Sequence, residues 1–323
     1  MSRHHRHLLP TLLALLASGP QARAEADQSV LMLRLAQAAE APRLVPALLT
    51  LPSGKPAGTA FPTVILVADA YAMDSRVAEL SDVLVQEGWA TLQIDLDGNA
   101  PEGPLGFARE SGAMPDDDWT SAQQLADVLA HLAERPAIDA RRVAVAGLGS
   151  GGRSALLAGA DEVTYPVLGA YGARFAAHAA LYPGCAALRE GGYARPQPWT
   201  PAPAAVFVAG QDTREPTGSC EALRQELAAA GRAATRWHDY PTASYGWDIG
   251  AAYGARTVLL PLPNGGRIRT KADANIAADA AGRLVSFLRP VLEQPALKHL
   301  PQEQTWLGHP ALEKSAPERP ESR

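Results

Sequence analysis

Basic side chains are in short supply in this chain of 323 residues. Lysine and arginine number 29 against 34 aspartates and glutamates, which gives a formal charge of -5 at pH 7. The first 24 residues hold three arginines and no acid, so without them the formal charge falls to -8. Recognition of a nucleic acid requires a basic surplus that neutralises phosphates. The charge balance therefore predicts no nucleic-acid partner.

Cysteine is scarce as well. The sequence has only Cys185 and Cys220, too few for a cysteine-based zinc site or an iron–sulfur cluster. The acidic run at 116–118 lacks the spacing of a calcium-binding loop, and we expect a solvated loop there, with Asp118 near the start of a helix. We therefore expect no metal site and no cofactor.

Long apolar runs are also missing. The stretch at 8–17 is apolar over ten residues, about half of the roughly 20 that a membrane anchor needs, and no later run approaches that length. Arg3 and Arg6 precede this stretch, and Ala22 and Ala24 form a small-x-small cleavage site. Residues 1–24 are therefore predicted to be a secretory signal peptide rather than a membrane span. The mature protein is expected in the periplasm or secreted.

Export bears on the two cysteines. In an oxidising compartment Cys185 and Cys220 can form a disulfide. The alternative is two separate buried thiols that act as small hydrophobic side chains. The sequence favours the disulfide but does not supply the Cα separation that the bond requires.

Strand and helix patterns alternate along the chain. Apolar or β-branched runs predict strands, and apolar residues at helical spacing predict helices. Loops rich in glycine or proline are expected at 98–118 and 183–203, and a poorly packed tail at 293–323. The alternation predicts one α/β domain over 25–292, with a mostly parallel sheet covered by helices on both faces. Strands are expected at 31–36, 44–51, 63–67, 90–95, 143–146, 176–181, 205–209 and 234–240, and the clearest helices at 77–87, 120–134, 220–230 and 272–292.

A glycine-rich turn at 147–152 follows one of these strands and precedes a helix, the context of a nucleophile elbow. The turn is so tight that the residues two before and two after the nucleophile must be small. With the nucleophile position at Gly149, the flanking residues are Gly147 and Gly151, which fit. With it at Ser150, Leu148 would occupy a crowded position. The better register thus places a residue without a side chain where the nucleophile belongs.

Five segments in chain order resemble the dienelactone hydrolase family of α/β-hydrolases, over about residues 44–292. The resemblance implies the α/β-hydrolase fold and a site for ester or lactone hydrolysis at the carboxyl ends of the strands. Cys185 and Cys220 are also placed as in some members. The segments are 67–72 (a strand end with an acidic residue and an oxyanion-hole amide), 92–97 (the next strand end), 147–152 (the elbow), 182–185 with 208–212 (the triad acid) and 240–248 (the triad histidine).

When the catalytic positions of the family are matched one by one to positions of this sequence, the triad is incomplete. Asp212 stands at the position of the acid, but Gly149 replaces the serine or cysteine and Tyr245 replaces the histidine. The oxyanion amides would be those of Ala70 and Ser150. A tyrosine with a reference pKa near 10 is a poor base at neutral pH, although its hydroxyl could donate a hydrogen bond to Asp212.

Other residues have two interpretations each. Ser150, Asp212 and His238 follow the Ser–Asp–His chain order of α/β-hydrolases, but His238 lies in the middle of a strand, and both it and Ser150 are more simply structural residues. Asp69 either faces the pocket or caps a turn. The aromatic residues of the strand ends either line an apolar pocket or only pack there; they are Tyr71, Tyr245 and Trp247.

Three hypotheses follow. The first is an exported pseudo-hydrolase that binds a small carboxylate, an ester-like molecule or a protein partner without turning it over. The second is an active ester or lactone hydrolase that uses Ser150 with Asp212 and a non-standard base. The third is a structural or interaction protein with an incidental pocket. The sequence leaves the oligomeric state open.

Overall fold

A computed structural model of the chain describes residues 26–35, 43–69, 74–96, 118–169, 172–232, 234–250, 254, 256–261 and 267–293. The predicted signal peptide, most of the loop at 98–118, the tail from residue 294 onward, and the site candidates Ala70 and Tyr71 lie outside these residues. Those expectations therefore stay predictions.

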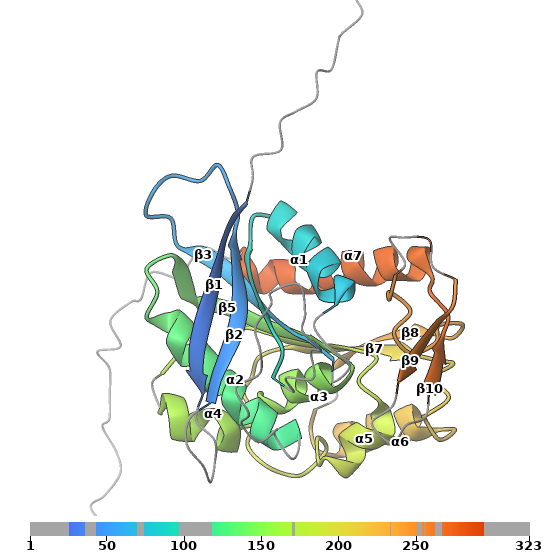
Figure 1. The fold of residues 1–323 in the computed structure, drawn as a ribbon. Coiled ribbons are helices and arrows are strands. Elements are labelled where there is room, and N and C mark those ends of the chain that lie inside the picture. The colour runs from blue at the N-terminus through green and yellow to red at the C-terminus, as the bar shows by residue number, and fades with distance from the viewer. Residues whose placement is uncertain are drawn as a thin grey trace, which may run out of the picture. The chain divides into compact units, whose positions relative to one another are not determined.

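A mixed sheet with a mostly parallel core organises the described residues (Figure 1). The strand order is β1-β2-β4-β3-β5-β6-β7-β8. β1 and β2 form an antiparallel hairpin, β2 pairs antiparallel with β4, and every later pairing is parallel. This confirms the predicted α/β-hydrolase fold. The strands are β1 (Asp27–Leu35), β2 (Arg43–Leu51), β3 (Phe61–Val67), β4 (Ala90–Ile94), β5 (Ile138–Leu148), β6 (His178–Leu181), β7 (Ala204–Ala209) and β8 (Arg236–Tyr240).

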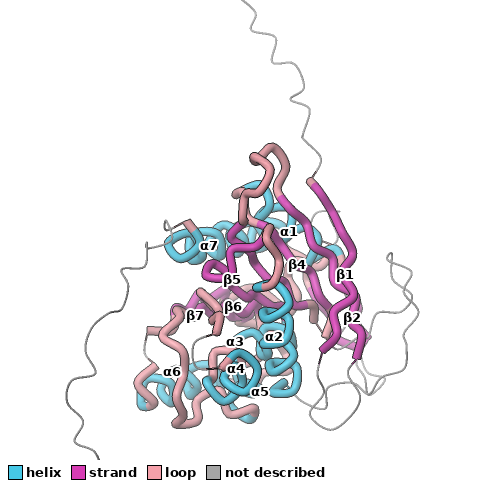
Figure 2. The backbone as a smooth tube through the Cα atoms, turned by 90° about the vertical axis from the view of Figure 1, so that its left-hand side faces the viewer, coloured by secondary structure: helices cyan, strands magenta, loops and turns pink. Residues whose placement is uncertain are grey.

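Helices lie on both sides of the sheet, with α1 and α7 on one side and α2 to α6 on the other (Figure 2). A hydrophobic core lies on each face of the sheet. Successive residues of β3 face opposite cores, as the strand period of two requires: Val64 and Leu66 pack against α1 and α7, whereas Ile65 and Val67 belong to the core of the other helices. None of the described helices combines the length and apolarity needed to cross a bilayer. The helices are α1 (Ser75–Gln86), α2 (Asp118–Ala133), α3 (Gly149–Leu157), α4 (Asp161–Leu168), α5 (Cys185–Glu190), α6 (Ser219–Ala229) and α7 (Ala274–Leu292).

Several short elements were not anticipated. The loop expected at 183–203 contains α5, and a second, two-stranded antiparallel sheet is built from β9 (Val258–Pro261) and β10 (Arg267–Thr270). Helix α2 begins at Asp118, so the acidic run ends in the first turn of a helix as expected. Elements of four to six residues carry too few periodic positions to distinguish them from loops.

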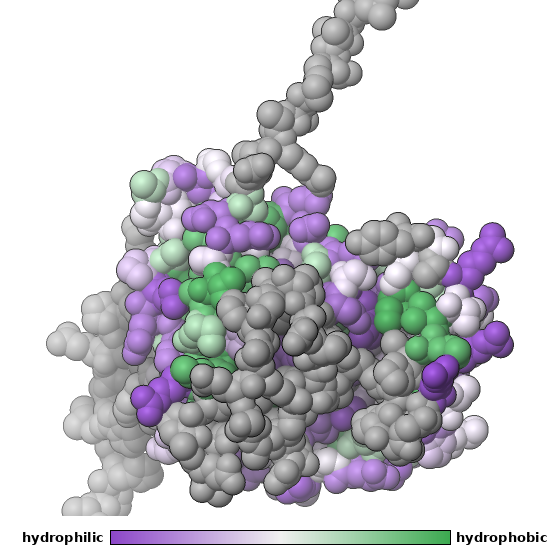
Figure 3. Space-filling model, viewed as in Figure 1, coloured by the Kyte–Doolittle hydropathy of each residue, from purple (hydrophilic) through white to green (hydrophobic). Residues whose placement is uncertain are grey.

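The outer face of the β1–β2 hairpin is apolar and exposed. Leu31, Leu33 and Leu35 point into a core. The alternating Val30 and Met32 point away from it and keep 43% and 52% of their surface exposed. Hydrophobic surface accordingly gathers over β1 and β2 in Figure 3. This face belongs to neither core of the described residues.

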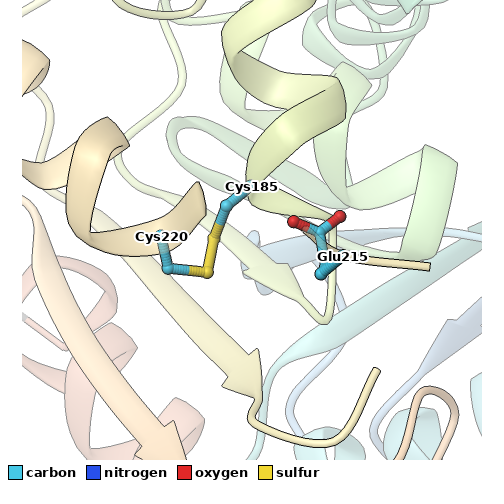
Figure 4. A group of neighbouring side chains, drawn as sticks. All are labelled: Cys185, Glu215 and Cys220. Atoms are coloured by element: carbon cyan, nitrogen blue, oxygen red, sulfur yellow. A yellow bond between two sulfur atoms is a disulfide. The ribbon is translucent and has the colours of Figure 1, made fainter. Parts of the chain in front are cut away.

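Cys185 and Cys220 form a disulfide that joins α5 to α6, with the two Cα atoms 4.9 Å apart (Figure 4). The alternative of two separate thiols is therefore wrong. Glu215 lies beside the bond, and its Oε2 accepts a hydrogen bond of 2.9 Å from the backbone N–H of Ala186 in the first turn of α5. Although these three residues cluster, sulfurs bonded to each other offer no thiolate to a metal.

We expect the joint substitution Cys185→Ala and Cys220→Ala to lower the free energy of unfolding by about 2–4 kcal/mol, because it removes a constraint on the unfolded chain. Urea denaturation followed by circular dichroism measures this. Dithiothreitol should destabilise the wild type by a similar amount and leave the double variant unchanged. Equal midpoints for the oxidised wild type and the double variant would contradict the expectation.

Candidate functional site

The carboxyl ends of five neighbouring strands converge on one edge of the sheet. Parallel strands present these ends together, and ligand sites of α/β folds form there. Each of β3, β5, β6, β7 and β8 is followed, at or just beyond its end, by a polar or glycine residue of the candidate site: Asp69, Gly149, Tyr182, Asp212 and Tyr245.

The turn between β5 and α3 has the geometry that the register through Gly149 requires. Gly149 has φ +53°, a left-handed conformation that L side chains rarely adopt. A Cβ on Gly147 would lie 2.2 Å from the carbonyl oxygen of Gly151, and a Cβ on Gly151 would lie 2.3 Å from that of Ala68. Gly149 is therefore the apex of the elbow, and Ser150 lies in the first turn of α3.

The space above the elbow is filled. A Cβ built on Gly149 would lie 2.3 Å from Asp69 Oδ1 and 2.3 Å from the hydroxyl oxygen of Tyr245. Asp69 Oδ1 also accepts a long hydrogen bond of 3.4 Å from the backbone N–H of Ser150. The carboxylate of Asp69 thus occupies the place of a nucleophile side chain and faces one of the two expected oxyanion amides.

Asp69 is fully buried and held by two further donors. The Tyr245 hydroxyl donates a hydrogen bond to Asp69 Oδ2, and Arg76 Nη1 lies 3.3 Å from the same oxygen. Burial, and next the negative charge of Asp69, raises the pKa of Tyr245 well above its usual value. Tyr245 is therefore a hydrogen-bond donor to Asp69, whereas the sequence had allowed a hydrogen bond from this hydroxyl to Asp212.

Asp212 is paired with an arginine instead. Its carboxylate accepts from Arg214 Nε at 2.9 Å and from Arg214 Nη2 at 2.6 Å, a bidentate pair. The guanidinium carbon of Arg214 lies 3.5 Å from the ring centroid of Tyr245, which is cation–π geometry. Where a triad acid would orient an imidazole, Asp212 therefore orients a guanidinium over a phenol.

A second polar cluster continues from Asp69 through Arg76. Arg76 Nη1 lies 3.4 Å from the hydroxyl of Tyr182, which donates to both carboxylate oxygens of Asp248 at 2.8 and 3.0 Å. Arg76 Nε donates to Asp74, the N-cap residue of α1, at 3.0 Å. Tyr182 has φ +42°, a strained conformation for a residue with a side chain, held in place by this cluster and by aromatic packing.

Sequence reasoning missed both arginines of the site. A signal existed for Arg76, which stands four and eight residues before the buried Leu80 and Leu84 and therefore shares the buried face of α1. Arg214 follows Asp212 by two residues in the turn after β7, where sequence gives no direction for its side chain.

The remaining candidates pack as structural residues. His238 stacks on Phe207 with ring centroids 4.6 Å apart, and the charged groups that act on it are Arg236, Asp239, Asp279 and Arg283. Among the described contacts, His238 therefore joins neither Ser150 nor Asp212. Trp247 packs edge-on against Tyr182 at 4.7 Å. His178 is buried, and its Nδ1 forms a hydrogen bond of 2.8 Å with the carbonyl oxygen of Ala155.

The Asp248 carboxyl should make stability depend on pH. Burial raises its pKa from 3.8 to about 6, although Arg76 and the Tyr182 hydroxyl lower it. The folded protein then holds a proton that the unfolded chain has lost, so this contribution to stability declines as pH rises from about 4 to above 6. The free energy of unfolding of Asp248→Asn, taken relative to that of the wild type, should rise by about 1–2 kcal/mol when the pH is raised from 4.5 to 7.5. Urea titrations at several pH values test this, and a pH-independent difference would refute it.

Comparison with known proteins agrees with this architecture. Residues 46–292 match the model of the dienelactone hydrolase family. None of the curated protein sequences matches the chain.

Solved structures resemble the chain in fold. One is a dienelactone hydrolase-like promiscuous phosphotriesterase from metagenomic libraries, with 14% identity, a TM-score of 0.57, and coverage of 82% of this chain and 98% of that one. A second is an α/β-hydrolase from a deep-sea metagenome library of the Medee basin (15%, TM-score 0.53, coverage 84% and 99%). A third is a thermophilic esterase of the planctomycete Thermogutta terrifontis (10%, TM-score 0.53, coverage 86% and 95%).

Proposed function

Because the chain belongs to the dienelactone hydrolase family, we propose that it is an exported member that binds a small ester-like or carboxylate-bearing molecule without hydrolysing it. One observation carries the proposal: the elbow has Gly149 at its apex, and Asp69 and Tyr245 occupy the volume that a nucleophile side chain would need. Acyl transfer requires a nucleophile and a base that takes its proton. The site offers a carboxylate and a protonated phenol in their places.

The base position supports the same conclusion. A phenol whose pKa is raised by burial and by a neighbouring carboxylate holds its proton at neutral pH. Asp212, which would orient a histidine, is engaged by Arg214. Restoring only one member of the triad would therefore leave the other two groups in unsuitable partnerships.

Hydrolysis is tested directly on the purified chain. We expect no turnover of p-nitrophenyl acetate or butyrate above the rate of the Ser150→Ala variant, and no labelling by a fluorophosphonate probe. A known dienelactone hydrolase serves as the positive control. Stoichiometric labelling of Ser150, together with ester hydrolysis that Ser150→Ala abolishes, would establish the alternative of an active hydrolase that uses Ser150 with Asp212 and a non-standard base.

Ligand binding has its own test. A carbonyl oxygen could replace Asp69 Oδ1 at the backbone N–H of Ser150, which Asp69 holds only at 3.4 Å. A neutral ester or lactone would not repel the Asp69 carboxylate, whereas a free carboxylate would. We expect γ-butyrolactone or methyl butyrate to raise the melting temperature, and butyrate to raise it less. An unchanged melting temperature with all three would favour an interaction protein with an incidental pocket.

Export rests on the signal-peptide pattern of the first 24 residues. Expression of the full chain in a bacterial host should give a periplasmic product whose amino terminus is Glu25. Recovery of the uncleaved chain from the cytoplasm would refute this part of the proposal.

A further inference from the structure

A cavity of about 220 Å³ lies between α1 and α7, on the α1–α7 side of the sheet. Helix α7 lines it with alanines, and Leu80, Val83 and Leu181 add further apolar wall. Four polar residues also line it: Arg76, Glu79, Trp247 and Asp248. At about 30 Å³ per water, the volume is large enough for a small organic molecule. The cavity does not include Asp69, Gly149 or Tyr245 and is distinct from the elbow.

Three buried polar atoms on its walls have no hydrogen-bond partner among the described residues, and two of them, on Trp247 and Glu79, have no ion pair there either; the third, Arg76 Nη2, lies 2.8 Å from Asp74 Oδ2. The indole N–H of Trp247, a residue with 0% exposure, meets no acceptor among the described residues. The Oε1 atom of Glu79 is likewise buried and meets no donor there. Buried polar groups in folded proteins are nearly always hydrogen-bonded. A donor and an acceptor left unpaired on one cavity therefore point to a molecule that bonds both.

The charge around the cavity indicates the sign of that molecule. Asp69 and Asp74 share the guanidinium of Arg76, but no cation among the described residues forms an ion pair with Glu79 or Asp248. Burial raises the pKa of both carboxyls: it outweighs the lowering effect of Arg76 and the Tyr182 hydroxyl on Asp248 and that of a hydrogen bond with Ser75 on Glu79, and the nearby charges of Asp74 and Asp82 raise the pKa of Glu79 further. A positive group in the cavity would relieve this excess of negative charge.

We propose that the cavity binds a small aliphatic amino alcohol as its ammonium ion. The ammonium group would be placed at the carboxylates of Glu79 and Asp248, and the hydroxyl oxygen would accept from the indole N–H of Trp247. The methylene groups would pack against the alanines of α7. The proposal is independent of the function proposed above, because none of these groups belongs to the elbow.

The test measures binding to the full chain by isothermal titration calorimetry and by melting temperature. The probes are 4-amino-1-butanol, 1-butylamine, 1-butanol and butyrate. We expect the amino alcohol to bind most tightly, the amine next, and the alcohol and the acid weakly or not at all. Comparable binding of 1-butanol would overturn the proposal, as would the absence of binding by every probe, which would mean that the cavity holds water only.

Two variants locate the site. Glu79→Gln should weaken the binding of the amino alcohol by about tenfold. Asp82→Asn removes an equal charge at an exposed position of the same helix, and it should change the affinity by no more than about twofold. Trp247→Phe should abolish the preference for the amino alcohol over the amine. The preference is the ratio of the dissociation constants of the amine and the amino alcohol, both measured on the same variant. A general loss of packing weakens both and does not change the ratio. Equal effects of Glu79→Gln and Asp82→Asn would overturn the proposal.

Discussion

Gly149→Ser should destabilise the protein by about 4–5 kcal/mol, or prevent folding altogether, even though it supplies the residue that the elbow lacks. The left-handed backbone at φ +53° accounts for about 1–2 kcal/mol. The larger part comes from the new Cβ, which would lie 2.3 Å from oxygens of Asp69 and Tyr245, both held by buried partners. Urea denaturation measures the loss.

Gly218→Ser is the matched control. Gly218 is in the left-handed conformation, with φ +83° and ψ 0°, and has nothing within 4 Å of its would-be Cβ, so this change carries the backbone strain without the collision. The free energy of unfolding of this control variant should fall by only about 1–2 kcal/mol. Asp69→Ala and Tyr245→Phe each remove buried contacts and are destabilising on their own, but combined with Gly149→Ser their effects should be less than additive, giving a coupling between these positions in a mutant cycle. Purely additive effects would show that the side chains do not collide.

Arg76→Met should lower the free energy of unfolding by about 3–5 kcal/mol, because it removes one partner of a buried ion pair and leaves the others charged. Both Arg76 and Asp69 are essentially inaccessible to water. The deficit should be smaller at pH 5 than at pH 8, since a protonated Asp248, whose pKa is about 6, no longer needs a nearby cation. Denaturation at both pH values measures the two effects.

Arg283→Met is the control for this prediction. Arg283 forms an ion pair with Asp279, but the two side chains are 53% and 47% exposed. Exposed pairs contribute little, so the loss should stay below about 1 kcal/mol. Combining Arg76→Met with Asp69→Asn should recover part of the deficit. A similar loss for Arg76→Met and Arg283→Met would contradict the role assigned to the buried cluster.

The fold and the elbow could be predicted because their determinants are local in the sequence. Continuous β-branched runs mark the central strands, and the register of the elbow follows from glycines two residues on either side of Gly149. The tight contacts at Gly147 and Gly151 have the steric cause expected for that register.

The partners of the site residues could not be predicted, because each depends on which side chains several strands bring together. The sequence allowed a hydrogen bond from Tyr245 to Asp212, yet the Tyr245 hydroxyl donates to Asp69, which is 176 residues distant in sequence. Asp212 is engaged by Arg214 from its own turn. Chain order and residue type do not distinguish these pairings, whereas the positions of β3, β7 and β8 do.

The occupied elbow also limits the routes by which substitutions could give this chain a nucleophile at position 149. Serine at position 149 requires Asp69 and Tyr245 to be displaced first, but loss of the Asp69 carboxylate leaves the buried guanidinium of Arg76 without one of its two ionic partners. A serine at position 149 alone, or the loss of Asp69 alone, would therefore give a less stable protein. Introducing a nucleophile at the elbow would need several simultaneous changes.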